Sequence, residues 1–282
     1  MLNHKQLEQY HSEGFTVVPF FIDSDQIQKF IGKIDAISKG NTLSAHDATR
    51  MEMEPEQEEN RTKIRRLYEP CTHYPVFQEY AESKKLLDCV EQLIGPNIIC
   101  HYSKLNMKPA KIGAVVDWHQ DLSYYPLTNR DSLAVLLYLD DTGVENGGLK
   151  ILPGMHTESL MDHTDGKLFQ GRITEELDES AAVNIEGPAG TAIFMHCMVP
   201  HASNLNQSDK PRRTLIVSYR AADAYPLYLT NRTDATEKYA RLVRGSEVYR
   251  ARFTMDEFPI PRYKDNIISL YQLQERSRTN TL

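Results

Sequence analysis

An imidazole and a carboxylate lie two residues apart in the segment Asp117-Trp118-His119-Gln120-Asp121, which we expect to be a strand. Side chains at i and i+2 leave the same face of a strand, so His119 and Asp121 are expected to point the same way. Such a pair supplies two of the three ligands of the facial triad that binds non-haem Fe(II) and leaves coordination positions open. His-x-Asp alone is a weak signal, so the third ligand decides the prediction.

Four later histidines could supply that ligand: His156, His163, His196 and His201. We favour His201, because a polar turn and then a β-branched, aromatic run follow it, and the run is expected to return as the second strand of a hairpin. That return would bring Arg212 back near His201. A guanidinium buried beside an iron site needs an anion, and its planar fork suits a carboxylate. The expected anion is a dicarboxylate cosubstrate.

These motifs resemble the phytanoyl-CoA dioxygenase family of Fe(II)- and 2-oxoglutarate-dependent oxygenases. The resemblance extends over nearly the whole chain, from Tyr10 to Asp223, and rests on His119-Gln120-Asp121, Glu145 to Leu149, Pro153 to His156, and His201-Ala202-Ser203 with Arg212. It implies that His119, Asp121 and His201 bind Fe(II). It also implies that 2-oxoglutarate chelates the iron and rests its far carboxylate on Arg212, with help from Ser203, while O2 takes the last position.

The same resemblance implies hydroxylation of an unactivated C-H bond, with release of succinate and CO2. Related halogenases lack the carboxylate ligand so that halide can bind iron, and Asp121 therefore favours hydroxylation. Two other classes of function stay open. One is a non-catalytic jelly roll that senses metal or 2-oxoglutarate. The other is a cupin-like isomerase or hydrolase with a different divalent metal, in which Arg212 would serve the substrate.

The segment from Ile98 to Met107 is expected to be a strand on which Tyr102, Lys104 and Asn106 share a face. The family places cosubstrate contacts on this strand, so the resemblance assigns Lys104 to the cosubstrate site, with Asn106 and Tyr102 behind it. Alternation cannot say which face is inside. These three residues could equally face solvent on an edge strand.

Substrate-binding candidates are the residues near the motifs that are aromatic or share a strand face with Arg212. They are Trp118, Tyr124, Tyr125, Ser218 and Arg220. Arg220 could bind a substrate carboxylate or phosphonate, or it could form an ordinary surface salt bridge. The partner is expected to be a small molecule, but the family acts on thioesters, amino acids and natural-product intermediates, and the resemblance does not choose among them.

The elements expected around these motifs form one domain over residues 1–282, mainly β with flanking helices and a double-stranded β-helix core of the cupin-like jelly-roll type. A helical scaffold covers about 1–95, the jelly roll about 96–222 and a tail about 223–282. Expected helices run from Asn3 to Ser12, from the N-cap Asp23 to Gly40, from Pro75 to Ile94 and, in the tail, from Glu237 to Val243. The residues from Pro153 to about Ala182 form an insert, in which His156 and His163 are expected to be structural or to support the ligands.

Residues 41–60 are polar and acidic, and we expect a solvated loop or, alternatively, a lid over the substrate. The basic residues that follow are Arg61, Lys63, Arg65 and Arg66. Such a run most often lies on a solvated face, although it could steer an anionic substrate.

Composition bounds the function class. The formal net charge of -7 argues against a nucleic-acid-binding protein, which needs a basic surface for phosphates. No apolar run approaches the length of a membrane span, and the N-terminus lacks the apolar core of a signal peptide, so we expect a cytoplasmic protein. The four cysteines lack metal-site spacing and are expected to be free and buried. The oligomeric state is not predicted.

Overall fold

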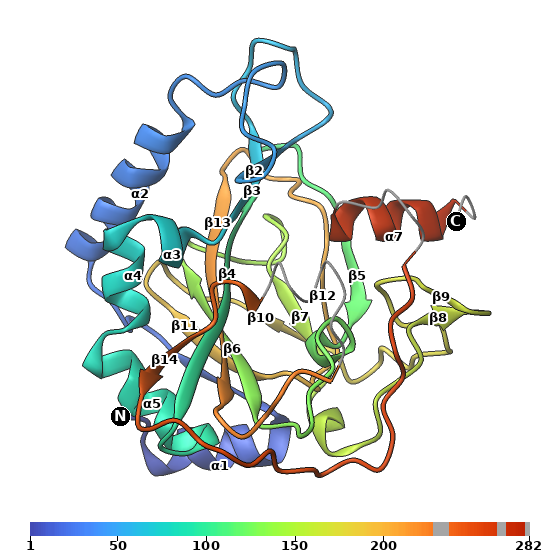
Figure 1. Cartoon of the computed structure of the whole chain (residues 1–282). Coiled ribbons are helices and arrows are strands. Elements are labelled where there is room, and N and C mark those ends of the chain that lie inside the picture. The colour runs from blue at the N-terminus through green and yellow to red at the C-terminus, as the bar shows by residue number, and fades with distance from the viewer. Residues whose placement is uncertain (228–236, 264–268, 280–282) are drawn as a thin grey trace.

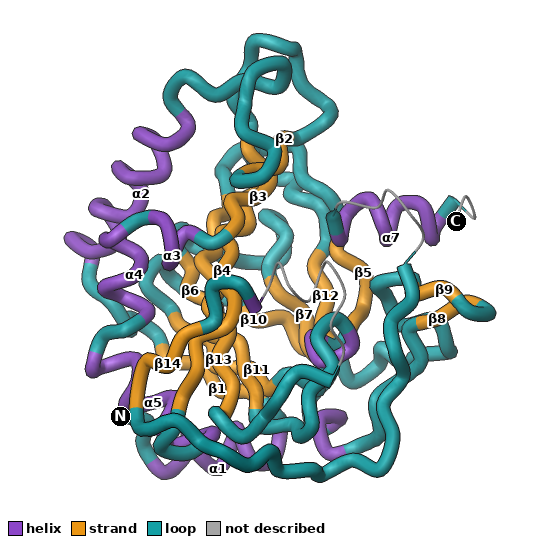
Figure 2. Tube along the Cα trace, viewed as in Figure 1, coloured by secondary structure: helices purple, strands orange, loops and turns teal. Residues whose placement is uncertain are grey.

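A computed structural model describes residues 1–227, 237–263 and 269–279 (Figure 1). Two antiparallel sheets form the centre of the molecule, and helices flank them (Figure 2). This arrangement confirms the expected mainly β fold with a jelly-roll core.

The large sheet has eight strands and forms one wall of the core. Its strand order is β1 (Phe15–Val18), β11 (Ala192–His196), β6 (Ser132–Tyr138), β13 (Arg212–Ala221), β4 (Ile98–Lys108), β3 (Ile64–Tyr68) and β2 (Met51–Met53), and β14 (Arg241–Arg244) also pairs with β4. The small sheet has four strands in the order β10 (Val183–Ile185), β7 (Leu149–Ile151), β12 (His201–Ser203) and β5 (Val116–His119). The insert after β7 contains the 3-10 turn η2 (Met155–Thr157) and the short pair β8 (Thr164–Asp165) and β9 (Leu168–Phe169).

Helices cover the outer face of the large sheet, along the left side and the base of Figure 1. They are α1 (His4–Glu13), α2 (Ser24–Ser38), α3 (Pro70–His73), α4 (Pro75–Ala81) and α5 (Lys84–Ile94). The side chains of Asn3, Asp23 and Ser83 cap α1, α2 and α5. Each accepts a hydrogen bond from a backbone N–H of the first turn that the helix cannot satisfy itself.

Strand alternation divides the buried residues of the large sheet between two cores. On β13, Leu215 and Val217 pack toward the helices, whereas Ile216 packs between the two sheets with Tyr138 and Leu149. The residues of β4 that alternate with the helix-facing Leu105 therefore also point between the sheets. This face carries the polar residues considered below.

Three expectations about secondary structure were wrong. The single helix expected over Pro75 to Ile94 is two helices. The first, α4, ends at Ala81, and Ser83 then caps the start of α5 by accepting a hydrogen bond from the backbone N–H of Leu86 at 3.4 Å. Part of the tail helix expected over Glu237 to Val243 is instead β14, which extends the large sheet. The tail also contains a helix that was not expected, α7 (Leu270–Arg278), which lies beside β5 (Figure 1).

The segment from 41 to 66 is more ordered than expected. Met51 and Met53 are buried on β2, and Arg65 and Arg66 are buried on β3, so the solvated-face interpretation is wrong for these two arginines. The Arg65 guanidinium lies 2.8 Å from the Glu54 carboxylate, which is also buried. The pairing explains how two charged side chains leave solvent here.

None of the helices in the described ranges is long and apolar enough to cross a membrane. Cys71, Cys89, Cys100 and Cys197 are free and buried, as expected.

Candidate metal centre

His119 and His201 meet because their strands are neighbours. β5 and β12 are antiparallel, and the two histidines are direct partners in the register. Side chains on the same face of directly opposed residues are close neighbours. The two ring centroids are 4.1 Å apart.

Asp121 joins the two histidines from a turn. β5 ends at His119, and Asp121 begins the 3-10 turn η1 (Asp121–Ser123), so the expected strand face does not position it. Its Oδ1 atom nevertheless lies 3.8 Å from Nε2 of both histidines. One donor atom from each of the three residues lies within 4.8 Å of the others, and among the described residues this is the group that could hold a metal ion.

Backbone carbonyls set the orientation of both imidazoles. Nδ1 of His119 lies 2.8 Å from the Asp117 carbonyl oxygen, and Nδ1 of His201 lies 3.0 Å from that of Val199. Because a carbonyl can only accept, the proton sits on Nδ1 and leaves the Nε2 lone pair facing Asp121. Burial lowers the pKa of both histidines, so each imidazole is neutral, which is the form that binds metal.

His163 supports the turn between the ligands, as expected for a residue that assists them. Its Nε2 accepts a hydrogen bond of 3.1 Å from the backbone N–H of Gln120. The Gln120 side chain in turn donates to the Met198 carbonyl at 2.7 Å. His156 and His196 lie apart from the metal ligands and pack against each other, with ring centroids 5.4 Å apart.

A cavity of about 50 Å³ opens between the two sheets beside His119 and His201. Arg212 and Lys108 line it, and both are buried. Arg212 donates to the Gly147 carbonyl at 2.7 Å and to the Thr214 hydroxyl at 3.1 Å, but its Nε has no partner. Within the described residues, neither cation has a carboxylate within 4.0 Å. Two neighbouring buried cations without a counter-ion favour an anionic ligand.

Lys108 was not predicted from the sequence. Its Nζ donates to the Ser203 hydroxyl at 2.8 Å and to the Asn204 carbonyl. Burial, together with the neighbouring Arg212, lowers the pKa of Lys108. Its position two residues beyond Asn106 on the same strand was the available signal.

The route by which Arg212 reaches the cavity differs from the expected hairpin. β12 belongs to the small sheet, whereas β13 belongs to the large sheet and pairs with β4 and β6. Arg212 therefore faces His201 across the cavity, with Lys108 as its register partner on β4.

Lys104 and Asn106 line the cavity, while Tyr102 shares their strand face without lining it. β4 has β13 on one side and β3 on the other, so the edge-strand alternative is wrong. Burial lowers the pKa of Lys104 to about 8, and nearby Asp121 and Arg66 act on it in opposite directions. This cation is poorly compensated by its surroundings.

The five substrate candidates do not line the cavity. Trp118 alternates with His119 on β5 and lies under Lys150, whose Nζ is 5.1 Å from the ring centroid. Tyr124 is closer to the site, because its ring meets that of His119 edge-on at 5.7 Å and its hydroxyl donates to the Gly171 carbonyl.

Tyr125, Ser218 and Arg220 have partners away from the cavity, and the last two are buried. The Tyr125 ring packs against His101 with centroids 5.0 Å apart, and Ser218 is the register partner of Tyr102. Arg220 forms a salt bridge of 2.9 Å with Glu237, and it is buried and not on the surface. Its partner explains its burial without a substrate.

The tail contributes residues that the sequence did not predict. Leu270 and Tyr271 of α7 line the cavity. Gln274 of the same helix accepts from the backbone N–H of Asp117 at 2.9 Å and donates to the Gly171 carbonyl at 2.5 Å. These bonds attach α7 to the strand that carries His119.

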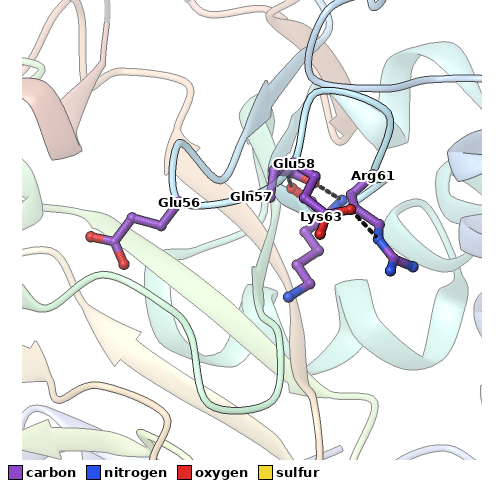
Figure 3. Close-up of a pocket in the computed structure, with 5 residues that line it drawn as sticks. All are labelled: Glu56, Gln57, Glu58, Arg61 and Lys63. Carbon is purple, nitrogen blue, oxygen red and sulfur yellow. Dashed lines mark hydrogen bonds and ion pairs between the residues drawn. The ribbon is translucent and has the colours of Figure 1, made fainter.

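A larger hollow of about 730 Å³ lies on the loop between β2 and β3 (Figure 3). It is lined by Glu56, Gln57, Glu58, Arg61 and Lys63. Most of these side chains are exposed, and the Arg61–Glu58 pair at 3.3 Å has charges that already compensate each other. This hollow differs from the cavity beside His119, because its lining side chains are mostly exposed to solvent and do not converge on one point.

Comparison with known proteins agrees with the geometry. The family model of phytanoyl-CoA dioxygenase (PhyH) matches residues 10–214. The chain belongs to the phytanoyl-CoA dioxygenase family. The matched region includes the three candidate metal ligands and Arg212, and the resemblance seen in the sequence is confirmed.

Individual relatives fall within one kind of chemistry. A probable alpha-ketoglutarate-dependent hypophosphite dioxygenase of Stutzerimonas stutzeri is 32% identical over 79% of this chain and 80% of its own length. L-proline trans-4-hydroxylase of Streptomyces griseoviridis is 25% identical over 78% of this chain and 87% of its own length. The crystal structure of EctD from S. alaskensis with 2-oxoglutarate and 5-hydroxyectoine shares the fold, with a TM-score of 0.67, 23% identity, and 80% and 78% of the two chains covered.

Proposed function

We propose that this member of the phytanoyl-CoA dioxygenase family is an Fe(II)- and 2-oxoglutarate-dependent dioxygenase that hydroxylates a small molecule and releases succinate and CO2. The observation that carries the proposal is the convergence of His119, Asp121 and His201 beside a cavity that also holds the buried Arg212. Relatives named as dioxygenases and hydroxylases support it.

The donor set fits ferrous iron. Two neutral imidazoles and one carboxylate on one side of an ion form the facial triad of non-haem Fe(II) oxygenases, which leaves the other side open. The carbonyl contacts of both Nδ1 atoms fix the two rings before metal arrives. In this proposal Asp121 supplies the carboxylate ligand that related halogenases lack, and its presence favours hydroxylation over halogenation.

The cavity fits 2-oxoglutarate. Arg212 would hold the far carboxylate, because its buried Nε has no partner in the described structure and its fork suits a carboxylate. The Ser203 hydroxyl also lines the cavity from β12 of the small sheet, and Lys108 donates to it across the cavity. We assign these three residues to the cosubstrate.

Iron and 2-oxoglutarate, when bound, supply the oxidising power for C-H hydroxylation. The chain contributes placement and exclusion of water. Leu136, Tyr138 and Ile216 give the cavity an apolar floor, and α7 covers it through Leu270 and Tyr271. We place Tyr124 at the edge of the reacting region, because its ring contacts that of His119. A cytoplasmic location stays a prediction from the sequence.

The test is production of succinate from 2-oxoglutarate with Fe(II) and O2, compared between His201→Gln and His196→Gln. His201 is buried and His196 is half-buried, but His196 lies outside the donor group. The wild type and His196→Gln are expected to form succinate, and His201→Gln is expected to form none above background. Equal turnover in the two variants would contradict the assignment.

A further inference from the structure

Arg66 is a buried cation whose hydrogen bonds are incomplete. It is the register partner of Asn106 in the β3–β4 pair, so both side chains project from the same face of the sheet, and Asn106 lines the cavity. Its Nε donates to Asn106 Oδ1 at 2.9 Å, whereas its Nη2 is buried without a partner. No carboxylate lies within 4.0 Å of it in the described part of the chain.

The neighbouring Arg65 provides a comparison, because carboxylates balance its charge. Its Nε and Nη2 both donate to Glu54, at 3.0 and 2.8 Å, and Glu52 lies 3.7 Å away. Glu52 also accepts from the Tyr68 and Ser269 hydroxyls. The nearby acids are therefore bonded to Arg65 and to the tail, and Glu52 attracts Arg66 only from beyond 4.0 Å.

Arg66 does not itself line the cavity but lies directly behind Asn106 and Tyr271, which do. Lys104 is a second cation beside Asn106. It lies two residues from Asn106 on β4 and lines the cavity. Its charged neighbours include Asp121 and Arg66, of which only Asp121 is attractive. Lys104 lies four residues from Lys108, a separation along the strand of roughly 13 Å, which sets it apart from the Arg212 end.

The charges of the proposed reactants do not balance these cations. Ferrous iron and Asp121 together carry one positive charge, and 2-oxoglutarate carries two negative charges. Arg212 alone balances the difference, so Lys108, Lys104 and Arg66 are in excess. Lys108 lies beside Arg212 at the cosubstrate end, which leaves the half-buried Lys104 and the buried Arg66 without a counter-ion. Uncompensated charges withdrawn from water are costly, so these two cations are suited to an anion.

We propose that Arg66 and Lys104 bind the prime substrate and that this substrate is a small oxyanion, such as a carboxylate or a phosphonate. The inference rests on the proposed function, and it moves Lys104 from the cosubstrate role expected from its position to a substrate role. Arg66 supplies a planar fork with a free Nη2, and Lys104 supplies a point charge nearer Asp121.

Helix α7 restricts what can bind there. The Tyr271 ring lies 4.7 Å from the Arg66 guanidinium carbon, and Tyr271 lines the cavity. Ser269, just before the helix, donates to Glu52 at 2.8 Å. The helix thus covers the anion site from above and favours a compact substrate over a long acyl chain.

The test uses charged probes and neutral probes of matched shape. Isobutyrate is paired with isobutyramide, and methylphosphonate with dimethyl methylphosphonate. Their binding to the full-length protein loaded with Fe(II) and 2-oxoglutarate is measured by anaerobic calorimetry, and succinate formation is measured in parallel. An anion of at least one pair should bind, its neutral partner should not, and the preferred pair distinguishes a carboxylate from a phosphonate.

The variants are Arg66→Gln, Arg66→Lys and Lys104→Gln, with Arg61→Gln in the exposed loop as the matched control. Arg66→Gln and Lys104→Gln should each weaken anion binding about tenfold or more, the loss expected for hydrogen bonds to a charged group. Arg66→Lys should retain part of the affinity. The affinity for 2-oxoglutarate should not change in any of them.

Three results would overturn the inference: neutral probes that bind as well as anions, no binding of either anion to the wild type, or an affinity for 2-oxoglutarate that falls in Arg66→Gln. Failure of the proposed function is a different result. In that case no succinate forms, while anion binding is retained by the wild type and lost in Arg66→Gln.

Discussion

The two walls of the cavity differ in kind. The small sheet places two neutral imidazoles at the ends of β5 and β12, which are 4 and 3 residues long. The large sheet places the cations Lys104, Lys108 and Arg212 on β4 and β13, which are 11 and 10 residues long. One wall presents lone pairs of the kind that bind a metal, and the other presents positive charges of the kind that bind anions.

The difference shows how each kind of ligand is positioned. A metal needs donors fixed within a few tenths of an ångström, and here backbone carbonyls hold both rings at strand ends next to a tight turn. Anions tolerate longer side chains, so cations on long regular strands are sufficient, and here Lys104 lies within β4, Lys108 ends β4 and Arg212 begins β13. Histidines on the large sheet, such as the buried His101 and the half-buried His196, do not belong to the donor group found among the described residues.

Removing the carboxylate from the donor wall is expected to have the largest effect. Asp121→Ala should lower Fe(II) affinity by at least about 100-fold, because even residues that only orient metal ligands contribute about 10-fold to 100-fold. Anaerobic Fe(II) titration measures it. Asp117→Ala is the matched control, since that carboxylate pairs with Arg278 on the outside of the molecule. Equal affinities for iron in the two variants would contradict the donor set.

Removing the guanidinium of Arg212 should leave the metal site intact. Arg212→Gln is expected to raise the KM for 2-oxoglutarate by about 100-fold, because truncating one partner of a buried charge pair costs about 2–5 kcal/mol. Fe(II) affinity should not change. The control is Arg213→Gln, because Arg213 binds Asp140 at 2.5 Å and does not line the cavity. A KM that rises equally in both variants would show a general structural effect.

Gly147 positions the cation wall through its backbone. Its φ of 75° is in the left-handed region, and a Cβ there would lie 2.5 Å from the Asn204 carbonyl oxygen and 3.1 Å from Lys108 Cδ. Gly147→Ala should therefore lower the free energy of unfolding by about 1–3 kcal/mol and weaken 2-oxoglutarate binding. Urea denaturation and calorimetry measure the two effects.

Gly40→Ala separates the backbone strain of a positive φ from the steric contact of the added Cβ. Gly40 has a similar φ of 86°, but nothing lies within 4 Å of the added Cβ. It should show the conformational cost alone, about 1 kcal/mol, with unchanged 2-oxoglutarate affinity. If Gly147→Ala behaved in the same way, the contact with Lys108 would have no role.

The last expected effect lies outside both walls and concerns a histidine of the large sheet. Burial lowers the pKa of His101 to about 3, with a further contribution from Arg220. Below pH 6.5 this histidine is protonated in the unfolded chain but stays neutral in the folded protein. The free energy of unfolding therefore falls as the pH decreases from about 6.5 toward 3. His101→Phe should reduce this slope by about 1.4 kcal/mol per pH unit. Urea denaturation at pH 6, 5 and 4 measures it, and parallel slopes for wild type and variant would contradict it.

The sequence predicted the centre of the site because its signals are local. His119 and His201 lie in short motifs, and the interval to Arg212 carries the family resemblance. Asp121 was correctly expected to lie beside His119, but the expected reason, a shared strand face, was wrong. A 3-10 turn positions Asp121 instead. Which side chains converge was thus more predictable than the local geometry that positions them.

The missed features depend on long-range contacts. Arg65 and Arg66 look alike in the sequence, and only the pairing of β3 with β4 shows which one faces Asn106. The role of α7 depends on bonds between Gln274 and residues more than 100 positions away. Trp118 was predicted to contact the substrate because it precedes His119. Successive residues of a strand point to opposite faces, however, so Trp118 points away from His119 and toward Lys150.

The most direct test of the account is an anaerobic titration of the protein with Fe(II) and then 2-oxoglutarate, followed by visible absorption. The wild type should develop a weak charge-transfer band that saturates with 2-oxoglutarate. His201→Gln should show no band, and Arg212→Gln should need much more 2-oxoglutarate to reach the same amplitude. A band of wild-type strength in His201→Gln, or an unchanged dissociation constant for 2-oxoglutarate in Arg212→Gln, would contradict the division into a metal wall and an anion wall.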